Sequence, residues 1–177
     1  KFLGVTIQNK LSWKPHIDYI RSKLSKTLAV LYKFKDLLNQ KTLYLLYCSL
    51  VLPYLMYCIK VWGNTYKTNL NPLFIIQKRA IRIVNKADYR EHTNQFFVHL
   101  KTLKFKDLVY FKTAQFMYKV KNNVLPAHIQ GLFSIRDSAY DLRGYKMFRK
   151  PKARTNVKQH CISFVGVDVW NKLDQEL

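Results

Sequence analysis

The chain has 177 residues, of which 49% are hydrophobic, so it holds enough apolar side chains for one sizeable core and is not expected to be disordered. The chain contains 31 Lys and Arg residues but only ten Asp and Glu. The resulting net charge of +21 predicts a surface that attracts polyanions, nucleic acid first and an anionic membrane second. Three cysteines without a C-x-x-C pair argue against a disulfide framework and are interpreted as buried free thiols.

The first segment, KFLGVTIQ at residues 1–8, contains β-branched residues and partly alternates, a pattern that predicts a short strand. A helix is expected next, because Ser12 is a candidate N-cap and Pro15 suits a first turn. Apolar residues then recur at helical spacing as far as KDLLNQ. The members of this stripe are Ile17, Ile20, Leu24, Leu28 and Leu31.

The second helix is expected to begin after Asn39 and to run to Val61, with a kink or break near Pro53. It carries LYLLYCSLVLPYLMYCI, residues 43–59, without a formal charge. An apolar face is predicted from Leu45, Cys48, Leu52, Leu55, Met56 and Ile59, and a tyrosine face from Tyr44, Tyr47, Tyr54 and Tyr57. Because tyrosine hydroxyls need partners in lipid and a proline interrupts this short stretch, we favour a soluble core over a membrane span.

A third helix is expected over LFIIQKRAIRIVNK, residues 73–86, with Asn71 as N-cap and Pro72 in the first turn. Its predicted apolar stripe consists of Leu73, Ile76, Ala80, Ile83 and Val84. Its opposite face gathers four cations without an anion, namely Lys78, Arg79, Arg82 and Lys86. Solvated helix faces usually mix Lys with Glu, so phosphate contact stands here beside the simpler interpretation of an ordinary solvated face.

Further along, a helix is predicted over Phe105–Lys121 and a short one as far as Phe133. From residue 135 the composition changes to turn residues, β-branched residues and dense cations, which indicates loops with short strands before a final turn. The segment FRKPKARTN, residues 148–156, is expected to be an exposed basic loop. Its cations are Arg149, Lys150, Lys152 and Arg154. The predicted fold class is thus mainly α: a helical bundle with a short N-terminal strand and an irregular, partly β C-terminal region.

Catalytic motifs are mostly missing. The chain has no adjacent Asp pair or D-x-D motif for a two-metal centre, and no P-loop, dinucleotide-binding or nucleophile-elbow motif. Asp137 and Asp141 are spaced to meet on a helix, but the arginines beside them favour ion pairing over a metal site. His16 and Asp18 fit the H-x-D form of an iron site, yet the surrounding pattern is helical and an Asp is favourable in a first turn. We therefore expect no catalytic and no metal site in this chain.

Six segments, taken in order, carry a family resemblance. They are KFLGVTIQNKLSWKPHIDYI, SLVLPYLMYCIKVWGN, LFIIQKRAIRIV, YDLRG, PKARTN and GVDVWNKL. The series resembles the carboxy-terminal part of a reverse transcriptase of non-LTR retrotransposons, or LINE elements, of the jockey or CR1 type, and it covers essentially the whole chain. One departure is that GVDVWNKLDQEL lacks the prolines that related copies often carry beside the Trp, which suggests a decayed copy.

The resemblance implies a parent RNA-directed DNA polymerase that uses Mg²⁺ and acts in the nucleus. Its paired catalytic aspartates belong to a palm motif upstream of Lys1, so this chain, which does not start with Met, is expected to be a non-catalytic fragment without a cofactor. Residues 1–10 then correspond to the end of the palm, residues 11–134 to a helical thumb-like domain and residues 135–177 to a basic C-terminal region. The implied partners are the missing palm and fingers and an RNA–DNA duplex.

The expected function is therefore a grip on the backbone of a primer–template duplex, dependent on salt and nearly neutral to sequence. The two cationic sets defined above are the candidate contacts, the set at 78–86 first and the set at 149–154 second. Residues 2–20 also resemble a segment labelled as the amino-terminal region of AlkB homologues, which are tRNA-modifying oxygenases and methyltransferases, but nothing downstream supports that chemistry. A membrane-surface module and a plain interaction scaffold are the remaining alternatives.

Overall fold

The computed structural model describes residues 1–136 and 147–176, with side chains up to residue 173, and shows a mainly helical chain. It divides into an N-terminal unit, Lys1–Leu108, and a C-terminal unit, Val109–Leu177. The helix α7 (Phe105–Lys121) contains the boundary and has the bounds that the sequence predicts. The expected division into residues 1–10, 11–134 and 135–177 stays a prediction.

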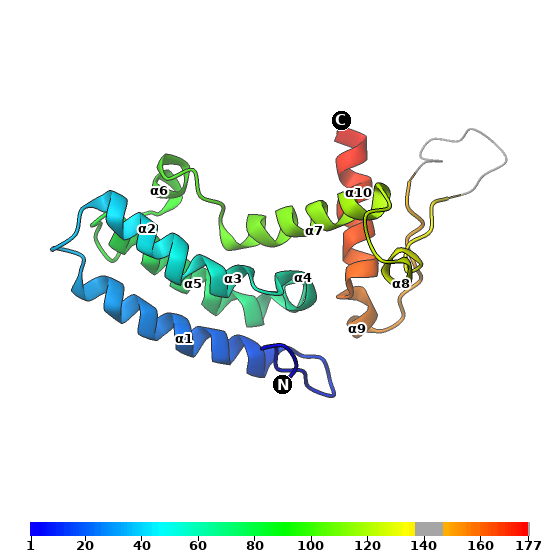
Figure 1. The fold of residues 1–177 in the computed structure, drawn as a ribbon, viewed down its shortest axis with the longest axis horizontal. Helices are drawn as coiled ribbons and strands as arrows, with labels where there is room; N and C mark the ends of the chain where they lie inside the picture. The colour runs from blue at the N-terminus through cyan, green and yellow to red at the C-terminus, as the bar shows by residue number, and fades with distance from the viewer. Residues whose placement is uncertain (137–146, 177) are drawn as a thin grey trace. The chain divides into compact units, whose positions relative to one another are not determined.

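The N-terminal unit is a helical bundle. Its helices are α1 (Lys14–Lys33), α2 (Gln40–Leu50), α3 (Leu52–Met56), α4 (Ile59–Trp62), α5 (Lys67–Val84) and α6 (Asn94–His99). The three longest, α1, α2 and α5, pack against one another (Figure 1), and α3 continues along the direction of α2. The core of the unit lies where these helices meet, because each brings one apolar stripe to the contact.

The structure confirms the apolar stripe predicted for α1 but not the N-cap predicted at Ser12. All five stripe residues are buried, and each contributes about 2 kcal/mol of hydrophobic stabilisation. The residue before the helix is Trp13, whose φ of 60° lies in the left-handed region, and no side chain caps the first turn. Ser12 is used elsewhere: its hydroxyl donates to Gln8 Oε1 (2.7 Å), and its carbonyl accepts from Thr65 Oγ1 (3.2 Å) and Asn69 Nδ2 (3.1 Å). These contacts explain why the N-cap prediction for Ser12 is wrong.

The predicted N-terminal strand is also wrong. Phe2 and Val5 pair with each other across a tight turn, with both N···O distances at 2.8 Å, and form an isolated bridge. Gly4 makes this turn possible because its φ of +80° is accessible to glycine at little cost. Tyr57 closes the arrangement by donating from its hydroxyl to the carbonyl of Leu3 (2.6 Å). The chain therefore folds back on itself here instead of extending along a neighbouring strand.

The uncharged stretch at 43–59 breaks into three helices, as expected near its proline. Asn39 caps α2 as predicted, since its side chain accepts from the backbone N–H of Thr42 (2.8 Å). Pro53 lies in the first turn of α3, where the N–H that it lacks would have no helical partner. Cys58, with φ of 50°, separates α3 from α4. In the part of the chain that the structure describes, no helix combines the length and the apolarity needed to cross a membrane.

The faces predicted for this stretch are partly wrong. The buried residues follow an i,i+4 row, Leu43, Tyr47, Val51, Leu55 and Ile59, whereas Leu45 is 66% exposed. Tyr47 thus shares the buried row with Leu43 and Leu55, and does not lie on a tyrosine face separate from the apolar one. A polar partner makes this possible, because a buried phenol needs a hydrogen bond to offset the loss of water.

That partner is Gln77 of α5, a fully buried amide that links four segments. Its Nε2 donates to the Tyr47 hydroxyl and to the carbonyl of Leu103, both at 3.0 Å, and its Oε1 accepts from the backbone N–H of Phe105 (2.7 Å). Phe105 is the first residue of α7, so the amide also satisfies an N–H that no helical carbonyl reaches. Burial raises the pKa of Tyr47 to about 12, which keeps the phenol neutral across the physiological range.

Replacing Gln77 by Leu keeps much of the buried volume but leaves the Tyr47 hydroxyl, the Leu103 carbonyl and the Phe105 N–H without a partner. We expect the free energy of unfolding, measured by urea denaturation, to fall by about 3 kcal/mol. Gln95→Leu, at an exposed position of α6, is the matched control and should stay within about 0.5 kcal/mol of the parent. Equal losses in the two variants would contradict the structural role of Gln77.

A second buried polar group, His16, ties the N-terminal turn to α1. It is 2% exposed, and its Nδ1 accepts from the backbone N–H of Thr6 (3.4 Å), so the neutral ring carries its proton on Nε2. The ring packs edge-on against Trp62, with the centroids 5.6 Å apart. Burial, and then the positive charge of Lys1, lower the pKa of His16 below its usual value.

This lowered pKa predicts a pH-dependent stability. Because the unfolded chain binds a proton at His16 that the folded chain excludes, the free energy of unfolding should fall as pH drops below about 6.5 and towards the folded pKa. His16→Asn keeps an acceptor near the position of Nδ1 but does not titrate, so its unfolding free energy should depend less on pH than that of the parent. His92→Asn, at an exposed position, is the control and should preserve the parental profile. An unchanged profile in His16→Asn would refute the assignment.

The C-terminal unit is helical, which corrects the expectation of a partly β region. After α7 it contains α8 (Ala127–Gln130), α9 (Asn156–Gln159) and α10 (Ile162–Glu176), and the described residues show one isolated bridge, Ile135 with Phe148, and no strand. Its core consists of Met117, Val120, Phe148 and Val167, with Phe116, Leu125, Phe133 and Trp170 packed against it. Asp137 and Asp141, considered above as metal ligands, lie outside the described residues.

The close packing of α7 and α10 explains why β-branched residues form a helix here. Gly166 of α10 faces Met117 so closely that an added Cβ would lie 2.7 Å from the sulfur atom. Tertiary contact therefore overrides the strand preference of the Val and Ile residues in α10. Asn171 of α10 also pairs with the backbone of Phe148, donating to its carbonyl (2.9 Å) and accepting from its N–H (3.1 Å). The side chain of Asn171 thus fixes segment 147–150 to α10, in addition to the backbone pairing of this segment with residues 134–136.

Candidate nucleic-acid interface

The helix that carries the first cationic set starts earlier than predicted. It begins at Lys67, and Pro72 lies inside it, so the expectation that Asn71 caps the helix is wrong. Thr65 and Asn69 hold the extra turn by donating to the carbonyl of Ser12, which is more than fifty residues away in sequence. The buried side of α5 contains Leu73, Ile76, Gln77, Ala80, Ile81 and Val84, whereas the predicted core residue Ile83 is half-buried.

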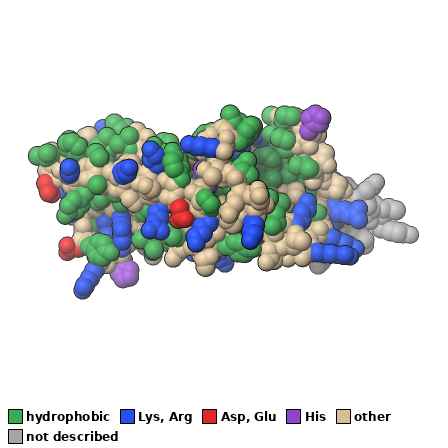
Figure 2. All heavy atoms as spheres, turned by 90° about the horizontal axis from the view of Figure 1, so that it is seen from below, with side chains coloured by type: hydrophobic (Ala, Val, Ile, Leu, Met, Phe, Trp, Pro, Cys, Tyr) green, Lys and Arg blue, Asp and Glu red, His purple; other side chains and the backbone are tan. Residues whose placement is uncertain are grey.

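The cations Lys78, Arg79 and Arg82 lie on the side of α5 opposite Gln77, because steps of about 100° per residue place them within one third of the helix circumference. Ile75 shares this side and is 42% exposed. None of the three cations pairs with a carboxylate in the part of the chain that the structure describes. Figure 2 shows one face of the molecule, over which Lys and Arg side chains are spread while acidic side chains are few.

The ring of Phe74 holds two lysines at one end of the cationic side of α5. The Nζ of Lys78 lies 4.5 Å from the centroid of the Phe74 ring, and the Nζ of Lys106 lies 5.7 Å from the same centroid. Attraction between an ammonium group and the negative face of a ring contributes about 0.5–1 kcal/mol at exposed sites. Phe74 therefore brings Lys106, which lies in α7, beside the cations of α5.

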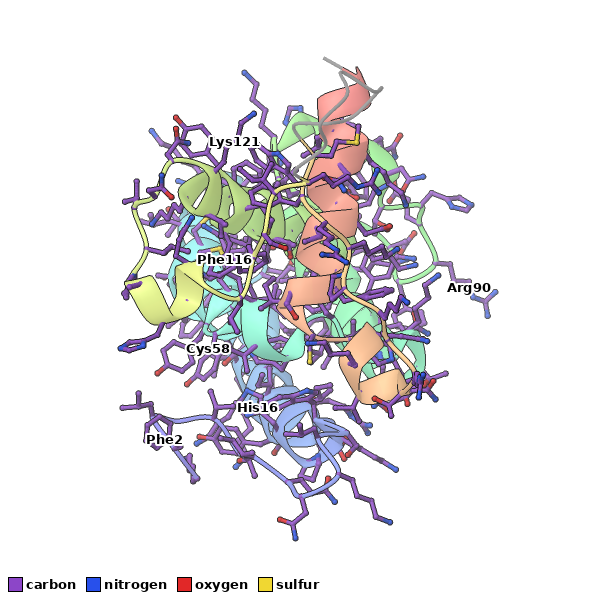
Figure 3. All side chains as sticks on the ribbon, turned by 90° about the vertical axis from the view of Figure 1, so that its right-hand side faces the viewer. Phe2, His16, Cys58, Arg90, Phe116 and Lys121 are labelled. Atoms are coloured by element: carbon purple, nitrogen blue, oxygen red, sulfur yellow. The ribbon has the colours of Figure 1, made fainter. Side chains whose placement is uncertain are left out.

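The other end of the surface is held by the loop at 85–93. Arg79 lies beside Tyr89, with its guanidinium carbon 5.9 Å from the ring centroid and an Nη 3.4 Å from the hydroxyl. Arg82 donates from Nε to the backbone carbonyl of Glu91 (2.8 Å), so it keeps its full charge. Arg90 extends from the same loop away from the ribbon (Figure 3). The two guanidinium groups thus have defined positions while their charges stay available to an anion.

Lys86 lies just beyond the end of α5, not on its face as predicted. Asn85 is the C-cap, and Lys86 adopts φ of 53° in the next position. The N–H of Lys86 donates to the carbonyl of Ile83 (3.1 Å), and the N–H of Ala87 donates to that of Arg82 (3.0 Å). This pair of bonds defines a Schellman motif, in which glycine is the usual residue at the left-handed position. Lys86 therefore supplies a cation at the cost of backbone strain.

This strain predicts a stability difference between two variants of equal charge. Lys86→Gly relieves the left-handed conformation and should raise the free energy of unfolding by about 1 kcal/mol. Lys86→Ala removes the same charge but retains the strain, so it should give no gain. Thermal unfolding of both variants under one buffer condition measures the difference, and equal stabilities would contradict the assignment of strain.

The second cationic set lies in the C-terminal unit, in the segment between Phe148 and α9. Lys150 forms an ion pair with Asp168, with its Nζ 2.7 Å from Oδ1. The same Nζ lies 4.4 Å from the centroid of the Phe164 ring. Lys172 approaches the other oxygen of Asp168 at 3.0 Å. The hydrogen bond from Lys150 is the main cause of the lowered pKa of Asp168. Lys150 thus anchors the segment, whereas Arg149, Lys152 and Arg154 have exposed side chains.

In sequence, the chain is similar to polymerases of transposable elements. The chain is 28% identical over 95 residues to the probable RNA-directed DNA polymerase from transposon BS of Drosophila melanogaster, a match that covers 50% of this chain and 10% of that protein. It is 29% identical over 111 residues to the RNA-directed DNA polymerase from mobile element jockey of Drosophila melanogaster, covering 60% of this chain and 12% of the relative. The jockey polymerase of Drosophila funebris is 26% identical over 113 residues, covering 62% and 12%.

These similarities are weak and partial, and the chain spans about a tenth of the length of the curated relatives it matches. All three relatives are RNA-directed DNA polymerases of transposable elements by name. No family model matches the chain. No solved structure matches it either.

The structure thus brings together part of the first predicted set. Lys78, Arg79 and Arg82 share one side of α5, with Lys86 in the loop that follows, and the second set lies in the other unit. Lys106 was missed because its only signal is contact with Phe74, which the sequence separates by 32 positions. Within the described residues, no three His, Cys, Asp or Glu side chains group to hold a metal ion.

Proposed function

We propose that this chain is the thumb-like, non-catalytic part of a retrotransposon RNA-directed DNA polymerase, and that it holds a primer–template duplex by its phosphate backbone. The observation that carries the proposal is the outer side of α5. There, three cations that pair with no carboxylate of residues 1–136 and 147–176 are held in place by aromatic rings and a backbone carbonyl. The curated relatives are RNA-directed DNA polymerases by name, which supports nucleic acid as the anionic partner.

The chemistry of these contacts favours phosphate over base edges. Guanidinium groups bind phosphate oxygens through paired N–H donors, and Lys binds them as a compact point charge. Contacts of this kind fix the position of a duplex without reading its sequence. Binding should therefore release counterions and weaken steeply as salt concentration rises, with similar affinity for unrelated sequences.

The test is a triple variant, Lys78→Gln, Arg79→Gln and Arg82→Gln, titrated with a labelled RNA–DNA duplex by fluorescence anisotropy across a salt series. Removing three phosphate contacts should reduce the slope of log affinity against log salt by about two to three units. A second variant, with both arginines replaced by Lys, retains the charge but loses the guanidinium contacts to Tyr89 and Glu91, so its slope should stay close to that of the parent.

The matched control removes the same number of charges from another surface, with Gln in place of the exposed residues Arg21, Lys26 and Lys33 of α1. We expect its slope to change by less than about one unit, because these residues do not contact the duplex in this account. Circular dichroism and thermal unfolding verify that all variants remain folded. If the α1 variant loses as much slope as the α5 variant, binding follows net charge alone and the interface on α5 is refuted.

A further inference from the structure

A pocket of about 300 Å³ lies at the N-terminal end of the N-terminal unit, at the lower end of the size range of small-molecule sites. Its walls come from the turn at residues 1–5, the first half of α1, and α3 with the residue that follows it. Phe2 and His16, both labelled in Figure 3, belong to two of these segments. The pocket is separate from the cationic side of α5, because none of its lining residues belongs to that helix.

Three tyrosines, Tyr19, Tyr54 and Tyr57, supply most of its aromatic wall. They are 39%, 40% and 51% exposed, so their ring faces are partly open to solvent. The wall contacts the N-terminal turn: the Tyr57 hydroxyl donates to the Leu3 carbonyl (2.6 Å), and Gly4 lies beside the same ring. Aromatic walls bind flat rings by stacking, with little preference among bases.

The rim of the pocket is cationic. The Nζ of Lys1 lies 4.8 Å from the centroid of the Tyr19 ring, and the Nζ of Lys23 lies 5.7 Å from the same centroid. Neither ammonium group pairs with a carboxylate among the described residues. An aromatic, otherwise apolar wall beside two unneutralised ammonium groups complements a ligand that joins a flat heterocycle to a phosphate.

We propose that this pocket holds one unpaired nucleobase of a bound nucleic acid, with the base against Tyr54 and Tyr57 and the adjacent phosphate near Lys1 and Lys23. The inference rests on the proposed function, because the cations of α5 would bring the strand to the chain. It adds a preference that backbone contact alone does not give, namely for a duplex with a single-stranded extension over a blunt one. His16 lies in the pocket wall but is buried against Trp62, so its role there is to support the wall.

The test compares three labelled RNA–DNA duplexes by anisotropy at fixed salt: a blunt duplex, one with a short single-stranded extension, and one with the same extension made abasic. The normal extension should raise affinity about ten-fold over the abasic one, in line with stacking of one base on an aromatic side chain. Equal affinity for the normal and abasic extensions would show that phosphates alone are bound and would overturn the proposal.

Tyr54 is the side chain to change, because it is partly exposed and its hydroxyl makes no hydrogen bond to another described residue. Tyr54→Leu should abolish the preference for the normal extension while leaving the affinity and salt slope of the blunt duplex unchanged, and Tyr54→Phe should retain the preference. Tyr32→Leu, at an exposed position near the other end of α1, is the control and should behave like the parent.

The outcomes separate the two proposals. A steep salt slope for the blunt duplex with no discrimination between normal and abasic extensions would leave the interface on α5 standing and refute the pocket. Discrimination that survives in Tyr54→Leu would place the base elsewhere and likewise refute the pocket. If none of the duplexes binds, both proposals fail together.

Discussion

The buried amide of Gln77 is the constraint on which the N-terminal unit depends. A helix packed only by apolar side chains can roll or slide by small amounts, because hydrophobic contact is not directional. Gln77 removes that freedom, since its three hydrogen bonds to α2, to the loop before α7 and to the first residue of α7 are satisfied in one orientation of α5. Fixing the inner side of α5 also fixes its outer side, where Lys78, Arg79 and Arg82 lie.

The outer side shows how like charges can be kept together on a small surface. Gathering cations without anions is unfavourable, because each repels its neighbours. The structure offsets part of this cost by placing Lys78 and Lys106 beside the Phe74 ring and by giving Arg82 a backbone carbonyl. None of these contacts neutralises a charge, so the surface retains its attraction for an external anion. A phosphate backbone, with its regular spacing of negative charges, would relieve the remaining repulsion.

Local periodicity was enough to predict the elements whose contacts are regular. The stripe of α1 and the bounds of α7 follow from apolar spacing alone, and the cap at Asn39 follows from residue type. Periodicity could not place Tyr47 in the core, since its burial depends on an amide 30 residues away, nor the start of α5, which depends on the carbonyl of Ser12. The helix α10 was missed because its packing depends on Gly166 fitting against Met117.

The candidate interface was also predictable only in part, because periodicity reveals residues on one helix but not contacts between segments distant in sequence. A wheel drawn from the sequence places Lys78, Arg79 and Arg82 together, because they lie within one regular helix. It cannot show that Lys86 leaves the helix through a left-handed residue or that Lys106 joins the surface from α7. The tyrosine-lined pocket also escaped prediction, since it forms only when the turn at residues 1–5 folds against Tyr57.

The account is tested most directly by following backbone amide resonances of the ¹⁵N-labelled chain while an RNA–DNA duplex is added. The account predicts that, within the N-terminal unit, the largest shift changes fall on the outer residues of α5 and on the loop at 85–91, with buried neighbours such as Gln77 changing little. Changes concentrated on the exposed cations of α1, with α5 unaffected, would contradict it.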